Sequence, residues 1–174
     1  MTKFKKNVRT LPVVVLCLFV LGGAAAFAQK QFKLIGRARP EVKVMLSGMV
    51  ERDGVRIPVE KASAVKPGEI LDWTITSANE GDAAASDYKA VAKIPAGTQF
   101  VAGSATAEGS ASVTYSIDNG KSFSPKPTID EKQPDGSVKK VPAPVTMYTQ
   151  LRYEWADPLV QGGKLNASYK VRLK

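Results

Sequence analysis

The feature that most constrains this chain is a strict two-residue alternation of apolar and polar side chains. It is cleanest near the C-terminus, where polar residues alternate with Leu165, Ala167, Tyr169, Val171 and Leu173. Successive side chains of a β-strand point to opposite faces of its sheet. A segment with this alternation therefore buries one face of a strand and leaves the other face in water.

Shorter segments with the same alternation recur along the chain and are separated by turn sequences. The expected strands are 42–47, 55–59, 71–76, 88–94, 98–102, 113–117 and 151–155. Trp73 and Trp155 share a phase with apolar neighbours on two of these strands, so we predict that both are core residues. The turn signals between them include Asp53-Gly54, Pro67-Gly68 and Asn119-Gly120. Seven to nine short strands joined by turns, without a sustained helical repeat, predict an all-β, antiparallel β-sandwich over residues 42–174.

The first 28 residues have the three-part pattern of a secretory signal peptide. Basic residues lead into an apolar run over 11–21, small residues follow, and Ala26-Phe27-Ala28 forms a cleavage site before Gln29. The apolar run is shorter than the roughly 20 residues that span a bilayer. We predict cleavage after Ala28, although an uncleaved N-terminal anchor is the alternative. Residues 29–41 are then a basic, flexible lead-in, with a short strand at 32–35.

The residues left after cleavage exclude most catalytic chemistry. Cys17, the only cysteine, falls within the signal peptide, and the chain has no histidine. Nucleophilic catalysis by Ser–His or Cys–His pairs and zinc sites built on those ligands are therefore excluded. The charge of residues 29–174, 21 basic against 16 acidic, is too modest to indicate nucleic acid. We expect a protein that is not an enzyme and that has no cofactor.

Two groups of polar residues could bind a ligand or could simply stabilise turns. Residues 116–123, Ser-Ile-Asp-Asn-Gly-Lys-Ser-Phe, resemble an Asp-box, which predicts a stiff hairpin or, alternatively, a carbohydrate-contacting loop. Asp118, Asp130 and Asp135 offer oxygens for calcium but lack the spacing of an EF-hand loop. Capping of turns is the simpler explanation, and we predict no metal site.

The segment 124–144 holds five of the eleven prolines, which keep it off a central strand. It predicts a protruding hairpin or long loop. Segments of this length are uncommon inside a compact domain unless they are functional or disordered. We therefore expect partner contacts there and at the nearby Tyr148. The residues concerned are Lys126, Asp130, Glu131, Lys132, Asp135, Lys139, Lys140 and Tyr148.

The stretch 67–104 resembles the bacterial conserved-repeat domain, also called domain of unknown function eleven. The motifs that carry the resemblance are Pro67-Gly68, the strand 73–76, Asn79-Glu80-Gly81, the small residues 83–85, Ile94-Pro95-Ala96-Gly97 and Phe100-Val101. The strands 151–155 and 165–173 look like the end of such a module. The resemblance implies an immunoglobulin-like sandwich in bacterial envelope or surface proteins, without catalytic residues.

These observations lead to three expectations for function. The first is an exported, non-catalytic structural or protein-interaction module of the bacterial envelope, in the periplasm or at the cell surface, without a transmembrane span after cleavage. Its partners would be envelope or surface proteins. The second is a carbohydrate-binding module that contacts polysaccharide. The third is a strand donor or acceptor, as in chaperones and fibre subunits.

Cleavage of the signal peptide gives the first testable prediction. Mass spectrometry of the exported protein should find a chain that begins at Gln29, because Ala26-Phe27-Ala28 is the signature of the cleavage site. A full-length chain retained in the inner membrane would contradict this assignment.

Overall fold

The structure is a computed structural model that describes residues 38–174. The predicted signal peptide and the short strand expected at 32–35 lie outside the described residues. The contacts divide the chain into two units, Met1–Ala38 and Arg39–Lys174. The second unit is built from strands and two short 3-10 turns, so the predicted all-β class is confirmed.

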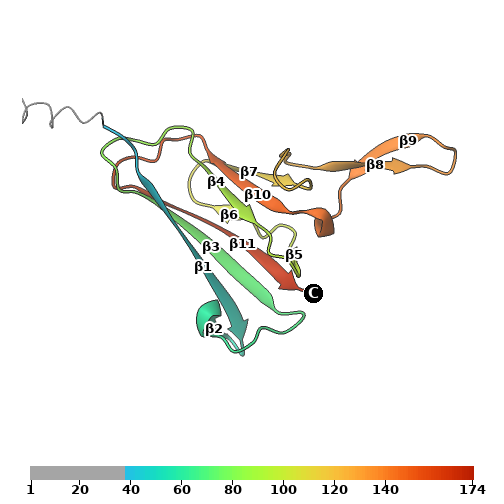
Figure 1. Ribbon diagram of the computed structural model, residues 1–174, viewed down its shortest axis with the longest axis horizontal. Helices are drawn as coiled ribbons and strands as arrows, with labels where there is room; N and C mark the ends of the chain where they lie inside the picture. The colour runs from blue at the N-terminus through green and yellow to red at the C-terminus, as the bar shows by residue number, and fades with distance from the viewer. Residues whose placement is uncertain (1–37) are drawn as a thin grey trace, which may run out of the picture. The chain divides into compact units, whose positions relative to one another are not determined.

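The strands of this unit form two main antiparallel sheets and a separate hairpin (Figure 1). The wide sheet has the order β2-β1-β3-β11-β5, with β6 also paired to β11. Its strands are β1 (Val42–Arg52), β2 (Val55–Pro58), β3 (Ile70–Asn79), β5 (Thr98–Phe100), β6 (Thr106–Ala107) and β11 (Lys164–Leu173). The narrow sheet, of order β4-β10-β7, consists of β4 (Lys89–Lys93), β7 (Ala111–Ser116) and β10 (Gln150–Trp155).

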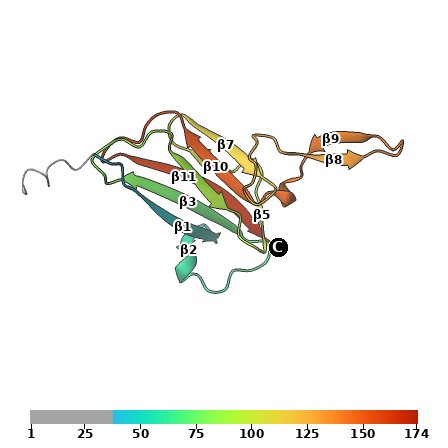
Figure 2. The same ribbon diagram turned by 45° about the horizontal axis from the view of Figure 1, so that its top comes forward.

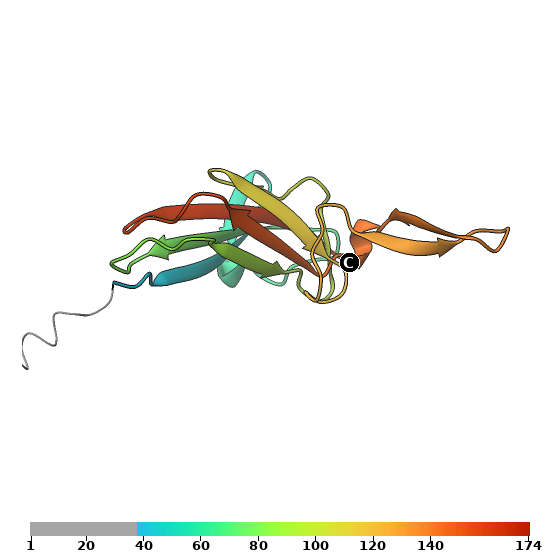
Figure 3. The same ribbon diagram turned by 90° about the horizontal axis from the view of Figure 1, so that it is seen from above.

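The two remaining strands, β8 (Thr128–Lys132) and β9 (Val138–Pro142), form the hairpin expected within 124–144. It projects away from the two sheets, as Figures 1 and 3 show. The 3-10 turns are η1 (Val59–Lys61) and η2 (Val145–Met147). The described residues thus form eleven strands rather than the predicted seven to nine. The difference comes from β6, which is only two residues long, and from the proline-rich segment, which forms the regular ladder of β8 and β9.

The core lies between the two sheets, which stack in the views of Figures 2 and 3. The wide sheet contributes Val50, Leu71, Ile75, Phe100, Ala167, Tyr169 and Val171, and the narrow sheet contributes Ala90, Ala92, Leu151, Tyr153 and Trp155. The alternation predicted for the last strand is confirmed, since the apolar residues of β11 are buried or half-buried. Trp155 is buried, as its phase in the sequence predicts.

Two buried tyrosines tie the sheets together in opposite directions. The hydroxyl of Tyr153, on the narrow sheet, donates to the carbonyl of Ser168 at 2.8 Å. The hydroxyl of Tyr169, on the wide sheet, donates to the carbonyl of Lys93 at 2.9 Å. Burial raises the pKa of Tyr169 to about 12, so its hydroxyl keeps the proton that it donates. These bonds satisfy polar groups that would otherwise be costly to bury.

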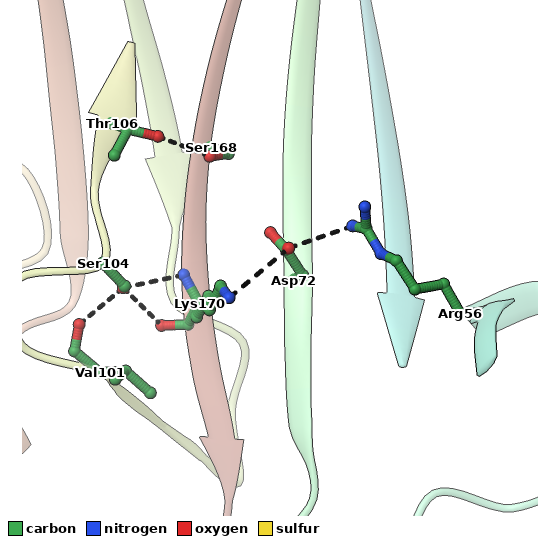
Figure 4. Close-up of polar contacts among 7 residues, drawn as sticks. All are labelled: Arg56, Asp72, Val101, Ser104, Thr106, Ser168 and Lys170. Carbon is green, nitrogen blue, oxygen red and sulfur yellow. Dashed lines mark hydrogen bonds and ion pairs between the residues drawn. The ribbon is translucent and has the colours of Figure 1, made fainter. Parts of the chain in front are cut away.

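The outer face of the wide sheet is polar, as the close-up in Figure 4 shows. Asp72 on β3 lies between Arg56 on β2, at 3.1 Å, and Lys170 on β11, at 3.9 Å. The hydroxyl of Ser104 donates to the carbonyl of Val101 and accepts from the amide of Lys170. This part of the face is therefore covered by polar contacts suited to water, while Met45 and Ile70 on the same face are exposed apolar side chains.

Asn79, the last residue of β3, closes one end of the sandwich. Its side chain is 1% exposed. Its oxygen accepts from the amides of Glu41 and Gly81, and its nitrogen donates to the carbonyls of Ala83 and Leu159. One amide therefore joins the start of β1, the turn after β3 and the loop before β11.

We expect Asn79→Ala to lower the free energy of unfolding by about 2–4 kcal/mol, because it leaves several buried backbone groups without partners. Urea denaturation followed by circular dichroism measures the change. Gln133→Ala is the control, because its side-chain amide contacts only Glu131 on the hairpin. That variant should stay within about 0.5 kcal/mol of the parent. Equal effects of the two substitutions would contradict the role of Asn79.

Candidate functional site

The narrow sheet leaves the first half of β1 uncovered. Val44 and Leu46 lie on the side of β1 that faces the sandwich interior, yet they are 59% and 55% exposed. Farther along the same side, Gly48 and Val50 are buried. The alternation in 42–47 correctly predicts a strand, but its apolar side chains remain exposed because β4 is an edge strand and nothing in the described chain lies beyond it.

An apolar groove of about 640 Å³ lies between β1 and β4. Its lining residues are Val42, Val44, Leu46, Trp73, Ile75, Tyr88, Lys89, Ala90, Val91, Ala92, Lys93, Pro95 and Tyr169. A cleft of this size, mostly apolar with a few polar groups, is typical of binding sites. The sequence gives no direct signal for it, since the same alternation describes a covered strand.

Trp73 forms part of this groove rather than being fully enclosed in the core. Its side chain lies on the inward face of β3, as predicted, but it is only partly buried. The ring lies against Gly48, where an added Cβ would come within 2.7 Å of the indole. The indole nitrogen is shielded from solvent and has no hydrogen-bond partner within residues 38–174.

The groove is bordered by an unpaired edge of β1. The amide of Glu80 donates to the carbonyl of Glu41, so Glu41 and every second residue after it direct their backbone groups towards β3. The backbone groups of Val42, Val44, Leu46 and Gly48 therefore point to the other side. There β2 pairs with β1 only from Met49 onwards. Seven residues, 42–48, thus have β3 on one side and, in the described chain, no strand on the other.

The edge of β4 borders the groove from the narrow sheet. The amide of Trp155 donates to the carbonyl of Tyr88, and the amide of Ile94 donates to the carbonyl of Thr149. By the alternation of antiparallel pairs, Lys89, Val91 and Lys93 direct their backbone groups away from β10 and towards the open side. The groove therefore lies between two unpaired strand edges.

All charged side chains of these two edge segments are lysines. They are Lys43 on β1 and Lys89 and Lys93 on β4. Lys43 forms an ion pair with Glu80, and Lys89 lies 3.2 Å from Glu154. Both acidic partners lie outside the edge segments, on the turn after β3 and on β10. Lys93 forms no ion pair within residues 38–174, so the positive charge at the border of the groove is carried mainly by this residue.

The structure places the predicted contact residues in two groups. Most lie on or beside the projecting hairpin, where Lys140 forms an ion pair with Asp130 at 3.1 Å and Glu131 lies opposite Lys139. The members of this group are Lys126, Asp130, Glu131, Lys132, Asp135, Lys139 and Lys140. These side chains are exposed.

Tyr148 is separate from the hairpin group. Its ring packs against Tyr115, with centroids 5.0 Å apart, and against Phe100, at 6.0 Å. These contacts make it part of the packing at the end of the sandwich, next to η2. The remaining residues of the expected site therefore form a charged ribbon without an aromatic platform.

The turn after β7 is stabilised by its own side chains. One carboxylate oxygen of Asp118 accepts from the Ser116 hydroxyl at 2.7 Å and from the Ser122 amide at 3.0 Å, and the other accepts from the Ser122 hydroxyl. These donors hold the pKa of Asp118 well below its usual range. Phe123 packs under Arg152, whose guanidinium carbon lies 4.3 Å from the ring centroid. The geometry is that of a stiff turn whose polar groups bond to each other.

Residues 38–174 hold no group of three histidine, cysteine or acidic side chains placed to bind a metal ion. Among these residues, no helix is long and apolar enough to cross a membrane. No protein-family model, curated protein or solved structure matches the chain.

The Asp118 turn gives a prediction about pH. Because the folded pKa is depressed, ionised Asp118 stabilises the fold above its unfolded pKa of about 3.9, and this contribution disappears as the pH falls through the folded pKa. The loss of stability between about pH 5 and pH 2 should therefore be smaller in Asp118→Asn than in the parent. Urea denaturation across that range measures it.

Ser122→Ala serves as the companion variant, since it removes one donor to Asp118 and should reduce the same pH dependence in part. Parallel stability curves for the parent and Asp118→Asn would show that the turn does not hold this carboxylate in its charged form.

Proposed function

We propose that this chain is an exported, non-catalytic module of the bacterial cell envelope that binds another protein by accepting one of its β-strands. The observation that carries the proposal is the unpaired edge of β1 over residues 42–48, which borders an apolar groove. An unpaired edge presents a row of free backbone donors and acceptors to an incoming strand.

The exposed apolar side chains on this edge are explained by binding to a partner and not by a role in the core. Val44, Met45 and Leu46 are consecutive and are 59%, 66% and 55% exposed. Soluble proteins usually protect edge strands with charges, prolines or bulges. In strand addition, the backbone supplies hydrogen bonds and pockets for alternate side chains supply specificity. Both components are present at this edge.

A binding role also agrees with the residue inventory. The segment 29–174 holds neither histidine, the commonest general base, nor cysteine, the thiol nucleophile. The groove is lined mainly by apolar and aromatic side chains, and its charged members are Lys89 and Lys93. We still predict that the exposed hairpin makes a second contact with the same partner.

Site-specific photo-crosslinking in intact cells tests the proposed function. A photoreactive phenylalanine analogue placed at Leu46 should form an adduct with another protein on irradiation, because that side chain lies in the open groove. The same analogue at Val160, which is also 59% exposed, serves as the control and should form little adduct.

The mass of the adduct identifies the kind of partner. An adduct with a different protein indicates that the bound strand comes from that protein. An adduct of twice the chain mass indicates that it comes from a second copy of this chain. Equal labelling from Leu46 and Val160, or none from Leu46, would overturn the assignment of the groove as the binding site.

A further inference from the structure

We infer that the strand accepted in this groove alternates apolar side chains with acidic ones. The inference rests on the proposed function and specifies the chemistry of the ligand. It follows from which backbone groups of β1 are free, which side chains line the groove, and which charges stand at the two edges.

The free edge determines the length and phase of the ligand. Pairing is open over 42–48, and β2 occupies the edge from Met49. A seven-residue extended segment therefore fills the edge. In an antiparallel pair, directly opposite residues place their side chains on the same face of the sheet. Ligand residues opposite Val42, Val44 and Leu46 point into the groove, and those between them point outwards.

The groove determines the chemistry of the inward positions. Its side walls are Val44 and Leu46 on β1 and Ala90 and Ala92 on β4, with Trp73 between the sheets. A polar side chain that entered would lose its contacts with water, and the apolar walls offer it only the shielded indole N–H of Trp73 as a partner. The inward positions, two residues apart, therefore require apolar side chains, for which valine or isoleucine are well suited because they favour strands.

The lysines determine the charge of the outward positions. Lys43 lies on the outer side of the β1 edge, and Lys89 and Lys93 lie along the facing edge of β4. Like charges directly opposite each other destabilise a strand pair, while opposite charges stabilise it. Carboxylates at the outward positions lie on the same face of the wide sheet as Lys43. Lys89 and Lys93 face the ligand from the other sheet and add a longer-range attraction for acidic charge, which is reduced where Lys43 and Lys89 pair with Glu80 and Glu154.

The chain's own N-terminal segment does not have this chemistry. Residues 29–37 contain Lys30, Lys33 and Arg37 and no acidic residue. Supplied in trans by a second copy, this segment would bring three positive charges to a border that is already basic. The charges therefore favour a strand from a different protein, and the test below includes the basic segment as a competitor.

Four synthetic peptides test the inference against the full exported chain. The first has the predicted pattern, Val-Glu-Val-Thr-Val-Glu-Val. The second replaces both Glu by Lys, the third has the composition of the first without its alternation, and the fourth is residues 29–37 of this chain. Binding is measured by NMR titration of backbone amides at low ionic strength, where surface charges are least screened.

We expect the Glu peptide to shift the amides of Val42, Val44 and Leu46 and to bind about tenfold more tightly than the Lys peptide. The non-alternating peptide and the 29–37 peptide should bind more weakly than the Glu peptide. Lys43→Glu should reduce the preference for the Glu peptide. Val160→Lys, in the exposed loop before β11, is the control and should leave it unchanged.

The outcomes separate this inference from the proposed function. Equal or tighter binding of the Lys peptide or of residues 29–37 overturns the acidic pattern and leaves strand acceptance intact. Binding of the non-alternating peptide as tightly as the Glu peptide overturns the alternation. If no peptide shifts the β1 amides, the inference fails, and the photo-crosslink from Leu46 decides separately whether the groove binds a protein.

Discussion

The unequal width of the two sheets is the constraint on which the rest of the structure depends. The narrow sheet has three strands and covers β3 and β11, but it does not reach over the first half of β1. Elsewhere the same alternation of side chains gives a closed core. At β1 it gives apolar side chains that face inwards and meet no second layer. The groove and the unpaired edge are both consequences of that difference.

The groove stays open because the sheets are held at a fixed separation. Tyr153 and Tyr169 each span the sandwich and bond to a backbone carbonyl of the opposite sheet. Tyr169 also lines the groove, and its bond to Lys93 holds one end of β4. If β4 moved towards β1 to bury Val44 and Leu46, this bond would break and leave a buried hydroxyl unsatisfied. The closed core thus prevents the open side from collapsing.

Much of the fold follows from the sequence, because alternation and turn residues act locally. Eight of the eleven strands, the turn at Asn119-Gly120 and the projecting segment 124–144 are predicted near their observed positions, whereas the two-residue β6 is not predicted. The groove is not predictable in this way, because alternation reports which side chains share a face and not whether another sheet covers that face. Trp73 illustrates the limit, since its phase shows that it points inwards but not that it borders an opening. The hairpin charges could be located from composition, but Tyr148 could not be recognised as a packing residue.

The positions of the two tryptophans have a spectroscopic consequence. Trp155 is buried and donates its indole N–H to the carbonyl of Glu108, so its surroundings change only when the sandwich unfolds. Trp73 lies at the groove, where the arrival of a ligand alters the polarity around its ring. The two tryptophans are thus intrinsic fluorophores that report on different events, unfolding for Trp155 and ligand binding for Trp73. With Trp155 replaced by phenylalanine, the emission maximum of Trp73 would follow occupancy of the groove without an added dye, and its quenching by iodide would measure how far the groove admits solvent.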